Sequence, residues 1–456
     1  MKSNAADDTT RQGRPEVVAT PDQLVEKLLW PRVEHGLYEE TKETIRVLAE
    51  ILGAPRVEAE PSGSSQWAAQ LLHAEESALS KVERDLSNTQ LLLHGYVLAT
   101  WMQAHEGSIQ IFGSNSTAPQ WRPLDLGEEH TRSVPFHLST YFPAGTLRES
   151  GIVVHICGGY PADITVYTEP GRRDVAESVL DEFQTELKGE GNPYRGRVLQ
   201  VSSDHGSQIR LSPITPTTET RADLVLGEKV WHEVELFLSA GTDRRDDLLA
   251  LGLSTSRGLL LAGQPGVGKT KLGRIVAAEM AGTLTVLVAD LDVMSSASEN
   301  LYQEVEKLGP TLVILEDIDA VADKGMRKSA GFSAFINALD GARVRNDILT
   351  LATTNDPGSL DPAVKRPGRF DVIVEVPLPT QAAREEILRI YLPGRGEALD
   401  VRAIAKTLDG ASGAELREVA RRAVLEHGTA DLTTAHLLEI TQTGRWKPAP
   451  ATGHYL

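Results

Sequence analysis

The chain has 456 residues, of which 41% are hydrophobic and 24% are charged, and its formal net charge is −18. This length exceeds what one hydrophobic core supports, so we expect two to four globular domains. The acidic charge argues against nucleic acid or an anionic membrane as a partner. No apolar run approaches the roughly 20 residues of a membrane span, and the N-terminus has no apolar signal segment. The single cysteine, Cys157, excludes an intramolecular disulfide and a cysteine-based metal cluster, so we expect a cytoplasmic protein.

The N-terminal region is expected to be mostly helical. Residues 1–20 are polar and are expected to be disordered. Residues 21–105 form a predicted helical segment, with leucines at helical spacing and a Pro-Ser-Gly-Ser linker at 61–64. The apolar pattern over residues 67–105 predicts one long amphipathic helix. That helix is expected to face a core, or else to form half of a helical hairpin or an oligomerisation element.

Residues 106–215 are predicted to form a small α/β domain. One helix is expected near 172–188, among apolar runs bounded by Gly, Pro and Asn that are typical of strands. No catalytic pattern is evident, and three histidines lack the spacing of metal ligands. The expected strands are 108–112, 151–156, 163–168 and 196–201, and the histidines are His130, His137 and His155.

Residues 216–378 carry a phosphate-binding pattern, G-x-x-x-x-G-K-T, between a strand pattern at 257–262 and a helical pattern at 271–280. That context favours a phosphate loop over a glycine-rich turn that binds nothing. Backbone N–H groups of such a loop surround phosphate oxygens, and the helix N-terminus adds its positive end. The lysine would reach the β- and γ-phosphates of ATP, and the threonine hydroxyl would hold Mg²⁺. The predicted binding residues are Gly263, Gln264, Pro265, Gly266, Val267, Gly268, Lys269, Thr270 and Lys271.

Two further apolar runs end in polar residues. The run 311–315 is followed by Glu316 and Asp317, the pattern of a buried parallel strand that carries acids to the sheet edge. One carboxylate would hold the Mg²⁺ shell and the next would polarise the attacking water. The run 348–354 is followed by Asn355, which would orient that water and sense the γ-phosphate, or else cap the next turn.

Arg366 and Arg369 lie three residues apart on a Pro-Gly turn. This arrangement suits an arginine finger, a cation that stabilises the transferring phosphoryl group from across a subunit interface. The alternative is a surface ion-pair cluster.

The C-terminal part has helical patterns at 380–392, 400–408, 412–427 and 431–441. Residues 379–443 are therefore predicted to form a helical lid. Residues 444–456 are predicted to be extended, with Trp446 and Tyr455 either disordered or docked on a neighbouring subunit.

Taken together, these motifs resemble those of the classical AAA ATPases. The resemblance implies an α/β P-loop domain with a helical lid, ATP and Mg²⁺ as ligands, and a ring of subunits, usually a hexamer. It also implies that Asn355 is the sensor 1 residue, and that Arg366 and Arg369 serve the neighbouring subunit. Residues 224–226 lie where family members contact adenine, and Gly413 and Ala414 lie where classical members lack the lid arginine of wider relatives. The matching segments are 263–270, 315–319, 337–341, 352–355, 361–371 and 412–416, within roughly residues 222–443.

The order Glu316-Asp317 departs from the usual Asp-Glu and resembles the subgroup that contains the mitochondrial Rieske-protein translocase. By position, the resemblance implies that Glu316 serves Mg²⁺ and Asp317 serves the water. Asp319 is not expected to be catalytic. Residues 288–302 lack the aromatic–hydrophobic–Gly tripeptide of unfoldases, which argues against threading an extended polypeptide; Met294 and Tyr302 either line a pore or are helix or core residues.

The predicted function is Mg²⁺-dependent ATP hydrolysis by an oligomeric ring, coupled to remodelling or moving a protein partner. Two alternatives remain open. The first is a slowly hydrolysing ATP-dependent switch or assembly scaffold. The second is a translocase of folded protein.

Overall fold

The computed structural model describes residues 61–444, apart from 114–117, 128–129, 160, 190, 204–208, 290–292, 294–295, 306–307, 324, 326–328, 345–346, 367 and 395–397. The described residues from Ser62 onward belong to one compact unit. The predictions for 1–20, for the leucine pattern at 21–53, for Met294 and for Trp446 and Tyr455 lie outside the described residues. Among the helices that can be described, none is long and apolar enough to cross a bilayer.

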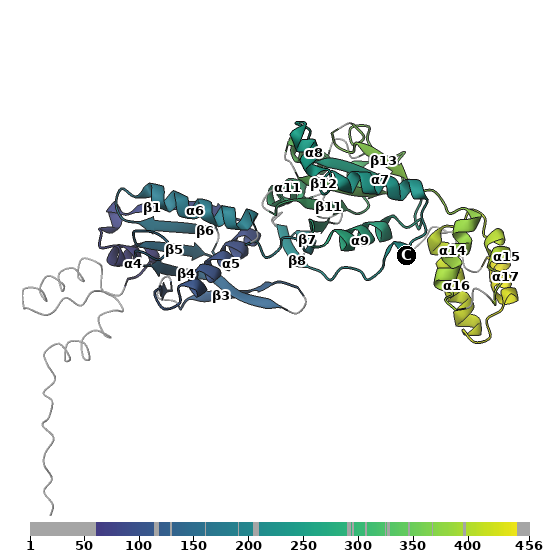
Figure 1. Ribbon diagram of the computed structural model, residues 1–456, viewed down its shortest axis with the longest axis horizontal. Coiled ribbons are helices and arrows are strands. Elements are labelled where there is room, and N and C mark those ends of the chain that lie inside the picture. Colours follow the sequence, from purple (N-terminus) through teal and green to yellow (C-terminus); the bar gives the residue numbers. More distant parts are fainter. Residues whose placement is uncertain are drawn as a thin grey trace, which may run out of the picture. The chain divides into compact units, whose positions relative to one another are not determined.

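Residues 64–188 fold around a six-stranded antiparallel sheet (Figure 1). The strand order is β1-β6-β5-β4-β2, and β3 pairs with β4. Alternate residues of its strands form one core with α5 and α6, because successive strand residues point to opposite faces. The elements are α4 (Ser64–Leu71), η1 (Glu76–Ala78), β1 (Ser80–Leu86), α5 (Asn88–Ala104), β2 (Gln110–Phe112), β3 (Gln120–Asp125), β4 (Thr131–Phe142), β5 (Ile152–Cys157), β6 (Ala162–Thr168) and α6 (Arg173–Lys188).

The prediction of one long helix over 67–105 is wrong. Strand β1 interrupts it and pairs with β6. Within β1 the buried Val82 alternates with charged neighbours, which is the period of a strand. Helix α5 then starts afresh, because the Ser87 side chain accepts a hydrogen bond from the backbone of Gln90 in a capping box.

A second, seven-stranded sheet has the order β13-β9-β12-β11-β10-β7-β8. All neighbours are parallel except β7 and β8, and we call it the parallel sheet. Its strands are β7 (Val198–Ser203), β8 (Ile209–Pro213), β9 (Arg257–Ala262), β10 (Thr285–Ala289), β11 (Thr311–Leu315), β12 (Ile348–Thr354) and β13 (Val372–Glu375). Its helices are η2 (Arg221–Asp223), α7 (Glu228–Ser239), α8 (Arg245–Ala250), α9 (Lys269–Met280), α11 (Ser298–Val305), α12 (Asp319–Ala322) and α13 (Ala330–Val344).

The strand expected at 196–201 exists as β7, but its assignment to the small N-terminal domain is wrong. It pairs in parallel with β10, with Val198 opposite Val286. Both faces of β7 contribute to cores, since Val198 and Leu199 are buried in different hydrophobic clusters. The strand is therefore part of the parallel sheet.

The lid has the four helices that the sequence predicts, and they share a separate core (Figure 1). The residue before each helix caps it, because its side chain accepts a hydrogen bond from a backbone N–H of the first turn. The capping residues are Thr380, Asp400, Ser412 and Thr433. The helices are α14 (Gln381–Tyr391), α15 (Val401–Thr407), α16 (Gly413–His427) and α17 (Thr434–Thr443).

Candidate nucleotide site

The phosphate loop connects β9 to α9, as the motif predicts. Gly266 and Gly268 have φ angles of 82° and 105°, which L side chains rarely adopt. Space is also short: a Cβ at Gly268 would lie 2.8 Å from Leu224, and one at Gly263 would lie 2.4 Å from the carbonyl oxygen of Val376. Glycine is therefore required by both backbone conformation and packing.

Lys269 begins α9 and is only 5% exposed. Its Nζ donates hydrogen bonds to the carbonyl oxygens of Gly263 (2.7 Å) and Gln264 (3.0 Å) and to Oδ1 of Asn355 (2.8 Å). Burial lowers the pKa of Lys269, while the charges of Asp317 and Asp319 oppose that shift. A buried cation with neutral oxygens as its hydrogen-bond acceptors would be stabilised by an anionic ligand.

Strands β11 and β12 bring Asp317 and Asn355 together, because their carboxyl ends lie side by side. Nδ2 of Asn355 donates to Oδ1 of Asp317 at 3.0 Å. The backbone of Asp317 has a φ of +51°, in the left-handed region, and its N–H donates to the Thr353 hydroxyl at 2.9 Å. The result is a hydrogen-bonded chain from Lys269 through Asn355 to Asp317, which we call the polar chain.

The two adjacent acids differ in position. Asp317 is exposed and lines the cavity described below, whereas the half-buried Glu316 is absent from the described residues of that lining. Asp319 accepts hydrogen bonds from the Thr354 hydroxyl and from the backbone of Asn355 and Asp356. It therefore fixes the turn that carries Asn355.

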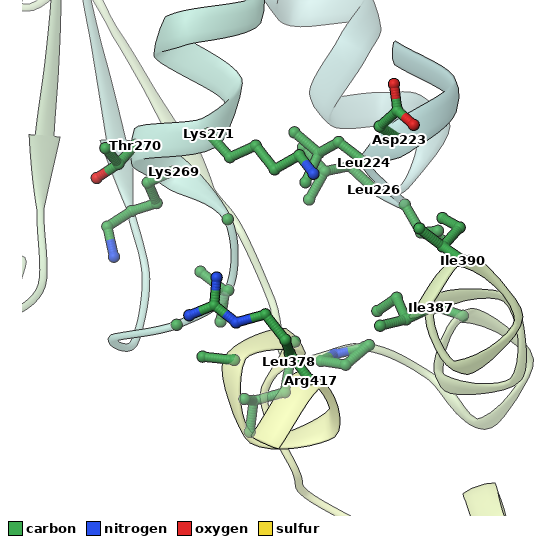
Figure 2. A pocket seen from close by; sticks show the side chains of 18 of the residues that line it. Asp223, Leu224, Leu226, Lys269, Thr270, Lys271, Leu378, Ile387, Ile390 and Arg417 are labelled. Atoms are coloured by element: carbon green, nitrogen blue, oxygen red, sulfur yellow. The ribbon is translucent and has the colours of Figure 1, made fainter. Parts of the chain in front are cut away.

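A cavity of about 910 Å³ lies above the phosphate loop and extends to the lid (Figure 2). The polar end holds Lys269 and Thr270, and the apolar end holds Leu224, Leu226 and, from α14, Ile387 and Ile390. This volume is typical of a small-molecule site, and its division suits a ligand with one charged end and one flat apolar end. Of the predicted binding residues, Pro265 through Lys271 line the cavity, and Gly263 and Gln264 hold Lys269.

The oxygen donors at the polar end fit Mg²⁺. Thr270 and Asp317 line the cavity, and Glu316 directly precedes Asp317. Among the described residues, no three His, Cys, Asp or Glu side chains are arranged to hold a metal by themselves. Mg²⁺ commonly takes one or two protein ligands together with phosphate oxygens and water, so a partial protein shell is what a Mg²⁺–nucleotide complex needs.

The two arginines lie elsewhere. Arg369 donates to both carboxylate oxygens of Asp340 at 2.7 Å and to the carbonyl of Ala363, whereas Arg366 is exposed. Their turn packs on the start of β9, where a Cβ at Gly258 would lie 1.8 Å from the carbonyl oxygen of Arg369. The phosphate loop begins at the other end of β9, roughly 16 Å away for five residues of strand. The cavity lining, as far as it is described, includes neither arginine.

One residue that the sequence offered as a candidate for lining a pore is excluded. Tyr302 is fully buried with its hydroxyl 3.0 Å from that of Thr350, so it is a core residue and does not line a pore.

Several cavity residues were not predicted from the sequence, and they come mainly from the lid. Only the helical period of α14 and α16 could have indicated which of their residues share one face. They include Glu219, Asp223, Arg274, Glu386, Ile387, Ile390 and Arg417.

Comparison with known proteins identifies the domain that holds this site. Residues 259–378 match the family model described as "ATPase family associated with various cellular activities (AAA)". These residues form an AAA ATPase domain. The subgroup resemblance suggested by Glu316-Asp317 stays a prediction.

Curated relatives share this domain. The proteasome-activating nucleotidase of Methanothermobacter thermautotrophicus is 35% identical over 189 residues, which is 38% of this chain and 46% of the relative. That of Pyrococcus horikoshii is 35% identical over 188 residues, 38% of this chain and 47% of the relative. The probable inactive ATP-dependent zinc metalloprotease FTSHI 2 of Arabidopsis thaliana, chloroplastic, is 31% identical over 298 residues, 58% of this chain and 33% of the relative. The chain thus spans less than half the length of each.

Proposed function

We propose that this protein binds ATP with Mg²⁺ in the cavity and hydrolyses it. The observation that carries the proposal is the polar chain of Lys269, Asn355 and Asp317 beside the phosphate loop. Lys269 would bind the terminal phosphates, and Thr270 and Glu316 would hold Mg²⁺. Asp317 and Asn355 would orient the attacking water, since both already face the cavity.

We further propose that the active site is completed between subunits. Arg366 and Arg369 sit at the opposite end of β9 from their own phosphate loop, beyond the reach of an arginine side chain. If they stabilise the phosphoryl group, they do so in a neighbouring subunit. A closed ring offers every subunit such a neighbour, and the family resemblance favours a hexamer.

The proposed partner is a protein that the ring remodels or moves. The names of the relatives support this, because proteasome-activating nucleotidases act on a protein assembly. The lid is built to respond to nucleotide, since the backbone N–H of Ala414 donates to the carbonyl of Gly266 at 3.1 Å. A change at the phosphate loop would therefore shift the lid, and through it the neighbouring subunit.

Phosphate release from ATP tests the proposal. We expect turnover that requires Mg²⁺ and is lost in Lys269→Ala. The control, Arg421→Ala, changes a lid arginine that pairs with Glu418 on the same helix, and it should turn over normally. Mg²⁺-independent turnover, or full activity of Lys269→Ala, would reject the site.

A second candidate function is an ATP-dependent switch that hydrolyses slowly. It is favoured by Asp317, whose side chain is one methylene shorter than the glutamate usual at this position in the family. Asp317→Glu distinguishes the two functions. A slow switch with a misplaced carboxylate should gain turnover, whereas a motor adapted to aspartate should lose it. The translocase alternative stays a prediction, and it requires that a folded test protein move without unfolding.

A further inference from the structure

Some of the charged side chains that line the cavity form ion pairs, and others form none among the described residues. Lys271 forms an ion pair with Glu219 at 2.7 Å. Helix α16 carries three arginines, of which Arg421 pairs with Glu418 and Arg422 pairs with Glu426. Among the described residues, no carboxylate pairs with the third, Arg417.

Arg417 enters the cavity from the lid. Figure 2 shows its side chain extending from α16 into the space below Lys269 and Lys271, and it lines the cavity. It is an exposed residue, so its guanidinium is accessible to a ligand. The polar end thus receives cations from two sides, Lys269 from the phosphate loop and Arg417 from the lid.

The helix that carries Arg417 is held against the phosphate loop. Ala414 donates its backbone N–H to Gly266, and a Cβ at Gly266 would lie 2.8 Å from that of Ala414 and 2.9 Å from the Ser412 hydroxyl. A capping box between Ser412 and Glu415 fixes the helix start. Arg417 follows Ala414 by three residues and so lies on the same side of the helix.

We propose that Arg417 binds the phosphate chain of the nucleotide from the lid of the same subunit. This inference rests on the proposed function, because it assigns a residue to the same ligand. A guanidinium binds phosphate oxygens through paired, charge-assisted hydrogen bonds, which suits a cation that has no carboxylate of its own. The sequence places no arginine at Gly413 or Ala414, and Arg417 supplies the lid cation one turn later. The phosphate chain of the nucleotide would then bridge the phosphate loop and the lid.

Nucleotide binding by the full chain tests this assignment. Titration calorimetry with Mg²⁺ would give Kd values for ATP and ADP, and competition would give that for adenosine. The variants are Arg417→Ala, Arg417→Lys and, as the matched control, Arg421→Ala. Arg417→Ala should weaken ATP and ADP binding about tenfold, as the loss of a charge-assisted hydrogen bond does, while adenosine binding stays unchanged. Arg417→Lys should restore part of the affinity, and Arg421→Ala should match wild type.

The contrary results are distinct. Wild-type affinity of Arg417→Ala for ATP would overturn the inference, as would an equal loss in Arg421→Ala. An equal loss for adenosine would mean that Arg417 only supports the fold of the lid, which thermal unfolding of Arg417→Lys would check independently. Failure of the wild-type protein itself to bind ATP would instead reject the proposed function.

Discussion

The two sheets place their polar residues differently. In the antiparallel sheet, polar side chains lie in rows across β4, β5 and β6, where His137 is opposite Cys157 and Cys157 is opposite Asp163. In the parallel sheet, the strand interiors are largely apolar, and the polar residues follow the strand ends. Because β9, β11 and β12 point the same way, Lys269, Asp317 and Asn355 meet at one edge beside a cavity. Direction of pairing thus decides whether polar groups meet one another or a ligand.

The polar rows of the antiparallel sheet largely satisfy themselves. Oγ of Ser139 and Nδ1 of His155 are 2.9 Å apart, and Sγ of Cys157 lies 3.7 Å from Nδ1 of His137. Burial, with a smaller contribution from His137, lowers the pKa of His155 to about 4. These contacts give the histidines a structural role.

The largest expected effect is at Lys269. Replacing it with alanine removes the cation at the phosphate end, so ATP affinity should fall by roughly 100-fold and turnover should become undetectable. Calorimetry and phosphate release would measure both. Replacement of His155 by glutamine should leave ATP affinity unchanged. An equal loss of ATP affinity in His155→Gln would contradict the claim that only the polar residues of the parallel sheet meet the ligand.

Arg366→Ala should lower turnover by about 10³-fold with little change in ATP affinity, as expected for an arginine finger. Mixing it with Asp317→Asn protein should restore activity, because some interfaces would then combine an intact arginine with an intact Asp317. Activity of the mixture that stays at the sum of the two variants would contradict action between subunits.

Arg369 needs a matched variant, because it is paired with Asp340. If Arg369 is a second finger, Arg369→Ala should lower turnover, and Asp340→Ala should retain it. If the pair only holds the turn, both variants should lose activity together. Steady-state ATP turnover of the two proteins separates these outcomes.

Asp317→Asn keeps the hydrogen-bonding shape but removes the charge that would polarise water. Turnover should fall by about 10²-fold while ATP still binds. Single-turnover phosphate release measures this step. Asp319→Asn serves as a comparison: it should act through the position of Asn355 and so also alter ATP affinity, since Asn355 contacts Lys269.

The smallest effect concerns stability in the antiparallel sheet. The pKa of His155 is about 4 in the folded chain and 6.5 in the unfolded chain, so the unfolded state takes up a proton first as pH falls. The contribution of His155 to the free energy of unfolding is therefore fully present above pH 6.5. It is lost as pH falls towards 4, by about 3 kcal/mol once both states are protonated. Urea unfolding between pH 4.5 and 7 would measure the free energy of unfolding against pH, and its slope should be smaller in His155→Gln than in the wild type. The control is His232→Gln, which changes an exposed histidine and should leave the slope unchanged. The same slope in His155→Gln as in the wild type would contradict the lowered pKa of His155.

The sequence predicted the positions of the phosphate loop, Asp317 and Asn355 better than it predicted the N-terminal fold, for physical reasons. The phosphate loop, the acids and Asn355 each follow a buried parallel strand, so local patterns suffice to place them on one edge. Strand β1 was missed because its short alternation of buried and exposed residues lies between two helices. The sheet to which β7 belongs was not predicted, because it is decided by long-range pairing with β10, which no local pattern indicates. Arg417 was missed because its role depends on where the lid meets Gly266. The separation of Arg369 from its own cavity required the packing of its turn on Gly258.

The measurement that tests the central claim most directly is ATP turnover per subunit as a function of protein concentration, with Mg²⁺ present. A site completed by a neighbour's Arg366 predicts a rate per subunit that rises cooperatively as subunits associate. A substantial rate per subunit that is constant down to concentrations where the protein is monomeric would contradict the account.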